Sequence, residues 1–268
     1  AFAGAEKWVF ADHLLNVPMA TIATTPAEAK NIEKEKIDAA KPAFKAYAEA
    51  LKFMTEHAAG LKGHASRGPE LINAANYGYD QTVQMFADGN ALFIQQGNWA
   101  YSNIEKINPE TAKNVSFIPL KMPFTDEMIQ DGRTAEQINS SIIVTTGNYY
   151  AINAKVSEEQ QKQAVEFLKW MEKEENVQKW IIDSFKFIPY NVTPEMKLEN
   201  PLSESIQKYL SAGQTFNDTV VGTPKTWSGE KVGTALLEQY IGKEEWDDET
   251  LDQIADLCVN SWKELKAE

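Results

Sequence analysis

The chain has 268 residues, enough for one large domain or two of ordinary size, and 43% of them are apolar, enough for a hydrophobic core. Acidic residues outnumber basic ones 39 to 26, and the formal net charge of −13 disfavours a protein dedicated to nucleic acids, whose phosphates require a basic surface. The single cysteine, Cys258, excludes an internal disulfide, and three scattered histidines argue against a zinc site. No run approaches the roughly 20 apolar residues of a membrane span.

The first half of the chain mixes helix signals with short β-rich runs. A helix is predicted to begin after Thr25, because Thr at the N-cap is followed by Pro at N1 and by Glu28 at N3. Apolar residues recur at helical spacing over 44–54 and predict a second helix that ends near Gly60. The runs that favour strands are 91–95, 115–119, 141–145 and 149–152.

The second half of the chain is mainly helical by pattern. A capping box at Ser157 and Gln160 opens a long helix that carries an apolar face. Further helices are predicted at 180–182, from Asn200-Pro201 onward, at 228–242 and at 251–265. Because helices alternate with short strands, the sequence predicts an α/β fold.

The chain has none of the common nucleotide-binding or hydrolase motifs: G-x-G-x-x-G, a phosphate-binding glycine loop, H-E-x-x-H and G-x-S-x-G are all absent. Cys258 lies in phase with the apolar residues of the last predicted helix, so we predict a core thiol rather than a nucleophile. The sequence therefore predicts no catalytic residue, no metal site and no cofactor.

The tryptophans divide into two groups. Those that fall inside helical patterns, and for which we predict core positions, are Trp170, Trp180 and Trp262. Trp8 lies near Glu6, Trp99 follows the end of a predicted strand, and Trp227 precedes a predicted helix. An indole at such a place, beside polar groups, suits the C–H face of a sugar ring, whose hydroxyls require hydrogen-bond partners. A role in anchoring loops explains these three tryptophans equally well.

The segment 86–104, which contains Gly97-Asn98-Trp99, resembles the central signature of the extracellular sugar-binding proteins of ATP-driven importers, the family that includes maltose-binding protein. Four more segments are similar to this family in the same order: 117–123, 147–153, 164–171 and 187–189. The resemblance extends over nearly the whole chain. It implies an α/β, two-lobe fold of the periplasmic-binding-protein-like type II.

The resemblance also implies a domain organisation. Residues 1–151 correspond to the main part of lobe two, 154–213 to the helical remainder of lobe one, and 216–268 to the C-terminal helices of lobe two. Because Ala1 maps to a point inside lobe two, we expect the N-terminal part of lobe one to be missing from this sequence.

The residues that the resemblance assigns to a ligand site are Glu6, Trp8, Asn98, Trp99, Asn148, Tyr149 and Trp227. Trp99 matches the tryptophan that stacks on the sugar, and Trp227 matches a second stacking aromatic. Glu6 and Trp8 match a Glu-x-aromatic element that lines the site. Asn148 and Tyr149 lie at the crossover between lobes, where they would line the site as well.

The function that the resemblance implies is non-enzymatic: capture of a sugar, preferably an oligosaccharide, between two lobes and delivery to the permease subunits of an ABC importer. The expected partners are a carbohydrate and the permease, with no nucleic acid. The expected location is extracellular or periplasmic, with a lipid anchor in the full-length bacterial lipoprotein. A glycan-acting enzyme and a sugar sensor are alternatives that use the same aromatic surface, and a monosaccharide or another polar solute remains open as the ligand.

Overall fold

The computed structural model describes residues 1–60, 66–145 and 149–267. The chain forms two compact units. The first unit comprises Ala1–Gly97, Ile118–Val144 and Gln214–Glu268, and the second comprises Asn98–Phe117 and Thr145–Gly213. Residues 98–117, which we expected to belong with the rest of 1–151, are therefore grouped with the second unit.

The first unit is built mainly from helices. Its α-helices are α1 (Asn16–Met19), α2 (Pro26–Lys30), α3 (Lys34–Ala39), α4 (Lys41–Glu56), α5 (Ala74–Tyr77), α6 (Tyr79–Ala87), α9 (Ala135–Asn139), α13 (Thr234–Gln239) and α14 (Asp248–Ala267). Its other helical turns are η1 (Val9–His13), η2 (Gly68–Ile72), η4 (Asp126–Met128), η6 (Val220–Gly222) and η7 (Trp227–Gly233). The predicted helix starts at Thr25 and near Ser228 are confirmed by α2 and η7.

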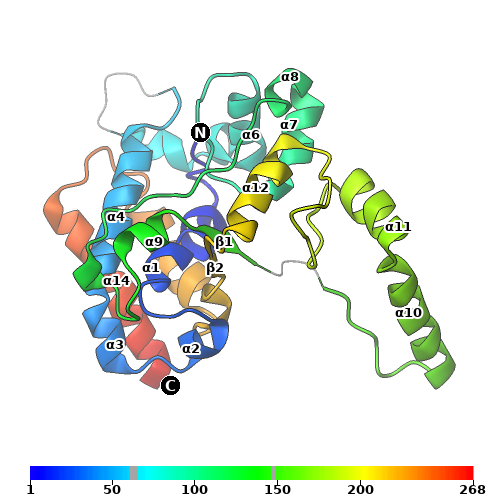
Figure 1. The fold of residues 1–268 in the computed structure, drawn as a ribbon. Coiled ribbons are helices and arrows are strands. Elements are labelled where there is room, and N and C mark those ends of the chain that lie inside the picture. The colour runs from blue at the N-terminus through cyan, green and yellow to red at the C-terminus, as the bar shows by residue number, and fades with distance from the viewer. Residues whose placement is uncertain (61–65, 146–148, 268) are drawn as a thin grey trace. The chain divides into compact units, whose positions relative to one another are not determined.

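Helices α4 and α14 pack side by side in the first unit (Figure 1). The period of 3.6 residues places Phe44, Tyr47 and Leu51 on one face of α4, and all three are fully buried. The Tyr47 hydroxyl donates to the Phe10 carbonyl at 2.5 Å, which satisfies the only polar atom of that side chain inside the core. The apolar stripe predicted for the last helix is thereby confirmed as the partner of α4.

Cys258 lies on the buried face of α14, and burial raises the pKa of its thiol. Because the thiolate is the reactive form, we expect iodoacetamide to leave Cys258 unmodified in the native protein and to alkylate it after denaturation. Mass spectrometry of the intact protein before and after guanidinium treatment measures the difference. Rapid alkylation of the native protein would show that the thiol reaches solvent.

The described residues contain two short strands, β1 (Ile142–Val144) and β2 (Thr215–Asn217). They pair in parallel, with Ile142 opposite Thr215. Parallel strands require a long crossover connection, and here residues 145–213, the larger part of the second unit, form it. The predicted strand at 141–145 is therefore confirmed.

Three other strand predictions are wrong, since 91–95, 115–119 and 149–152 form no strand in the described structure. A strand is completed only by ladder hydrogen bonds to a partner. The Gln95 amide donates to the Ala1 carbonyl and the Ala1 amino group donates to the Phe93 carbonyl, which pairs the run with one residue rather than with a strand. The Phe117 amide donates to the Ser205 side chain. Because the described residues are mostly helical, the expected two-lobe α/β architecture is not confirmed.

The second unit is also helical. Its elements are η3 (Asn98–Ala100), α7 (Tyr101–Ile107), α8 (Pro109–Ala112), α10 (Glu158–Met171), α11 (Glu174–Asn176), η5 (Val177–Ser184) and α12 (Pro201–Ser211). The predicted helix starts are confirmed: Ser157 and Gln160 form the capping box of α10, and the Asn200 side chain accepts from the Ser203 amide at 2.7 Å at the start of α12.

Helix α10 leaves much of its apolar face exposed. Phe167 is 54% exposed and Trp170 is 40% exposed, and their rings stack with centroids 5.9 Å apart. The prediction of a core position for Trp170 is therefore wrong. Trp180 is half-buried beneath the Lys179 ammonium, whereas Trp262 is fully buried as predicted. Periodicity identifies the apolar side of a helix but not whether another element covers it.

Candidate ligand-binding site

A carboxylate holds two aromatic rings together in the first unit. The Trp8 indole N–H donates to Glu6 Oε2 at 3.1 Å, and the Tyr79 amide, at the start of α6, donates to Glu6 Oε1 at 3.3 Å. The rings of Trp8 and Tyr79 lie 6.1 Å apart and are inclined at 43°. Because both oxygens of Glu6 accept hydrogen bonds, the indole is fixed in orientation beside an anionic group.

The backbone next to Trp8 and at Gly78 positions the side chains of this group. Trp8 is the N-cap of η1, a turn of π-helix in which Val9 and Phe10 are buried and anchor the backbone. A Cβ atom at Gly78 would lie 2.8 Å from the Ala74 carbonyl and 3.5 Å from the Glu6 carboxylate. The absence of a side chain at Gly78 therefore leaves room for Glu6 to reach the first turn of α6. Glu6, Trp8 and Tyr79 are each half-buried, so part of their surface remains accessible.

Trp99 belongs to the second unit and lies in η3, two residues after Gly97, the last residue of the first segment of the first unit. The side chain is 40% exposed, whereas the two residues that follow it, Ala100 and Tyr101, are buried. Buried neighbours on the same turn hold the backbone, so the indole is presented by a fixed element rather than by a loose loop. Asn98, beside it, is half-buried.

Tyr149 also belongs to the second unit, where its side chain is 81% exposed. Asn148, its neighbour in the predicted site, lies outside the described residues. The sequence-predicted residues are thus divided between the units: Glu6 and Trp8 are in the first, and Asn98, Trp99 and Tyr149 are in the second.

The structure contradicts the assignment of Trp227 to the ligand site. Trp227 is fully buried, and its indole N–H donates to the Cys258 carbonyl at 2.9 Å. The ring packs edge-on against Trp262 at 5.1 Å and against Phe44 at 6.0 Å. Its position before a helix suggested exposure, but η7 packs against α14 and places the ring in the core. No face of the indole remains for a sugar.

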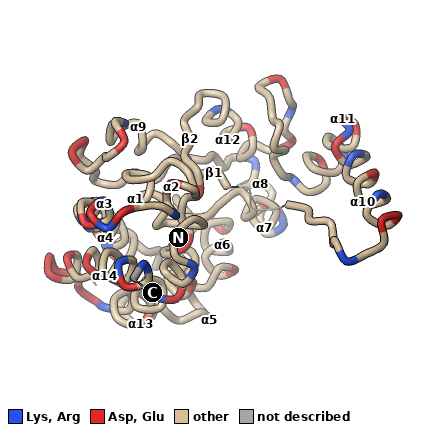
Figure 2. Tube along the Cα trace, turned by 90° about the horizontal axis from the view of Figure 1, so that it is seen from below, with Lys and Arg blue, Asp and Glu red and all other residues tan. Residues whose placement is uncertain are grey.

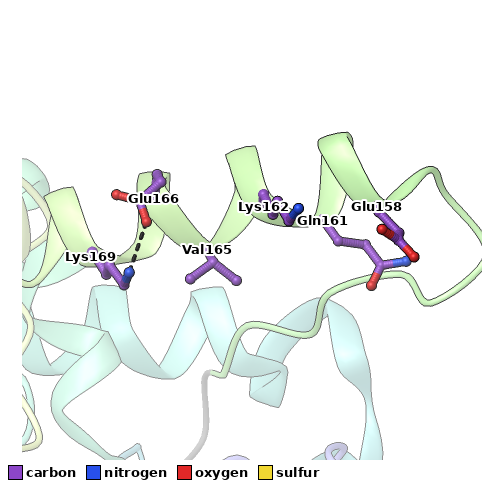
Figure 3. A pocket seen from close by; sticks show the side chains of 6 residues that line it. All are labelled: Glu158, Gln161, Lys162, Val165, Glu166 and Lys169. Atoms are coloured by element: carbon purple, nitrogen blue, oxygen red, sulfur yellow. Dashed lines mark hydrogen bonds and ion pairs between the residues drawn. The ribbon is translucent and has the colours of Figure 1, made fainter.

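A hollow of about 410 Å³ lies along α10. Figure 3 shows the six side chains that line it, which are Glu158, Gln161, Lys162, Val165, Glu166 and Lys169. All six come from one helix, and the ion pair of Lys169 with Glu166 at 2.8 Å joins exposed groups. A ligand site usually brings polar groups together from several elements around an apolar surface. This hollow does not, so we do not assign the ligand to it.

Charges are mixed over the surface. Figure 2 shows acidic residues along most of the labelled helices, with basic residues between them. In the part of the chain that the structure describes, no group of three or more His, Cys, Asp and Glu residues is arranged to hold a metal ion. Among the same residues, no helix is both long enough and apolar enough to cross a membrane. The net charge of −13 disfavours an anionic ligand.

Comparison with known protein families identifies the family of this chain. Residues 6–231 match the family described as bacterial extracellular solute-binding protein, and the chain belongs to this family. Membership implies a periplasmic-binding-protein-like fold, an extracellular or periplasmic location, and capture of a ligand for ABC transport. Proteins of this family are in general not enzymes. We found no match among curated proteins and none among solved structures.

Proposed function

We propose that this solute-binding protein captures a carbohydrate and delivers it to the permease subunits of an ABC importer. The observation that carries the proposal is the group formed by Glu6, Trp8 and Tyr79. An indole held rigidly beside a carboxylate combines the two things that a sugar ring needs: a flat surface for its C–H face and an acceptor for its hydroxyls.

The proposal favours an oligosaccharide over a monosaccharide. Within the first unit, Trp8 and Tyr79 offer two half-buried rings beside one carboxylate, which is more aromatic surface than a single sugar ring covers. The family resemblance suggests that capture occurs by closure of two lobes. A ligand that contacts both lobes of such a fold stabilises the closed state by its differential affinity.

Isothermal titration calorimetry with glucose, maltotriose, cellotriose and xylotriose tests the proposal. We expect at least one trisaccharide to bind more tightly than glucose, because a longer chain covers more aromatic surface. Chromatography of the same mixtures is expected to recover the sugar intact. Binding of an amino acid or a peptide with no response to any sugar would contradict the carbohydrate proposal, and cleavage of a trisaccharide would favour an enzyme.

A further inference from the structure

Three polar side chains from distant segments interact in the first unit: His13 ends η1, Gln95 lies two residues before Gly97, and Asp218 directly follows β2. The Gln95 amide nitrogen lies 2.8 Å from His13 Nδ1. The charge of the Asp218 carboxylate acts on the imidazole of His13 and raises its pKa. All three side chains are half-buried, so each keeps some accessible surface.

The hydrogen bond between His13 and Gln95 distinguishes the two tautomers of the neutral imidazole. An amide nitrogen only donates, so Nδ1 accepts and the proton of the neutral ring is on Nε2. Burial lowers the pKa of His13, while the Asp218 carboxylate acts in the opposite direction. With Nδ1 occupied, the amide of Gln95 is held in one orientation, and its oxygen faces away from the ring.

Two oxygens of this group are buried and receive no hydrogen bond within the described residues: Gln95 Oε1 and Asp218 Oδ1. The hydroxyl oxygen of Thr219, the next residue along, is in the same condition. Buried polar atoms in native proteins are nearly always paired, because leaving one unpaired costs about 1–3 kcal/mol. These three oxygens, two of them on consecutive residues, are therefore free to accept a hydrogen bond from a donor outside the chain.

The location of the group supports a ligand rather than a structural role. Asp218 lies at the carboxyl end of a strand in a parallel pair, which is the end where ligands bind in parallel sheets. Gln95 lies four residues before Trp99 in sequence. His13 ends the π-helical turn that Trp8 begins, one i to i+5 step away. His13 and Gln95 thus lie within five residues of the two proposed stacking tryptophans in sequence.

We propose that Gln95 and Asp218, with Gln95 positioned by His13, form a hydrogen-bonding site that accepts protons from neighbouring hydroxyl groups of the ligand. The inference rests on the proposed carbohydrate function and extends it, because it names the side chains that accept hydrogen bonds from the sugar hydroxyls. Adjacent hydroxyls of one sugar ring can donate to two separate oxygens at once. Hydrogen bonds of this kind that involve a charged acceptor are the stronger ones.

The test is calorimetry of two variants, Asp218→Asn and Gln95→Leu, with glucose, maltotriose, cellotriose and xylotriose. We expect each variant to bind the recognised sugar roughly tenfold to hundredfold more weakly, as loss of a hydrogen bond with a charged or buried partner implies. The melting temperature of ligand-free Asp218→Asn is expected to be unchanged or higher, because the change removes a charge from a half-buried side chain at the same size. Asp80→Asn, the same change at an exposed site of α6, is the matched control and is expected to bind like the parent.

The outcomes separate this inference from the proposed function. If a sugar binds and needs Trp99, but folded Asp218→Asn and Gln95→Leu both bind it within twofold of the parent protein, the hydroxyl site is wrong and the carbohydrate function stands. If no sugar binds the parent protein, both proposals fail. If spermidine binds instead and its binding is lost in Asp218→Asn, the site of Asp218 and Gln95 binds a cation. The proposal that it binds hydroxyl groups would then be wrong.

Discussion

Replacing Trp227 with alanine is expected to destabilise the protein by about 3–5 kcal/mol, the usual cost of removing a fully buried large aromatic side chain. The side chain fills the space between Phe44 of α4 and Trp262 of α14, and its indole N–H pairs with the Cys258 carbonyl. The variant loses this packing and leaves a buried carbonyl without its donor. Urea unfolding followed by circular dichroism measures the change in the free energy of unfolding.

Trp227→Phe separates the two contributions, since it keeps an aromatic ring in the cavity and removes only the indole N–H and part of the volume. We expect it to lose clearly less stability than Trp227→Ala. A Trp227→Ala protein that unfolds at the parental urea concentration, but no longer binds sugar, would show that the ring reaches the ligand. That result would restore the assignment made from sequence.

Trp99→Ala is expected to have the opposite profile. Sugar binding is expected to weaken by about 2 kcal/mol or more, a factor of about 30, as loss of an aromatic residue at the centre of a binding surface typically does. The free energy of unfolding is expected to change little, because the side chain is already 40% exposed. Calorimetry gives the affinity, and urea unfolding gives the stability of the same preparation.

Trp170 offers a matched control. It is also 40% exposed and also lies in the second unit, but on α10, where it stacks on Phe167. We expect Trp170→Ala to bind sugar with parental affinity, because nothing in the sequence pattern or in its surroundings assigns it to the ligand. Equal losses of affinity in Trp99→Ala and Trp170→Ala would indicate a general effect on the second unit, and Trp99 would lose its specific role.

Features that depend on a few consecutive residues follow from local sequence. Capping residues such as Ser157 and Asn200 mark helix starts because their side chains bond to backbone amides within the next three residues. Periodicity identified the buried face of the last helix, which contains Cys258 and Trp262. The motif at Gly97-Asn98-Trp99 was sufficient, together with other segments in order, to indicate the class of protein that the family match establishes.

Which elements pack against a partner depends on long-range contacts. Residues 91–95 have the composition of a strand and form none, because a ladder needs a second strand that local sequence does not specify. For the same reason, the burial predicted for two tryptophans is the reverse of the burial observed. Helix η7 packs on α14 and buries Trp227, whereas Trp170 is exposed on α10.

The polar group of His13, Gln95 and Asp218 was also beyond sequence reasoning. Its members lie 82 residues or more apart, each in an unremarkable local pattern. A sequence shows which side chains can donate or accept hydrogen bonds. Whether these donors and acceptors are paired depends on burial and on neighbours from elsewhere in the chain. Local chemistry therefore fixed where helices begin and which class the protein belongs to, while long-range packing fixed which side chains remain accessible to a ligand.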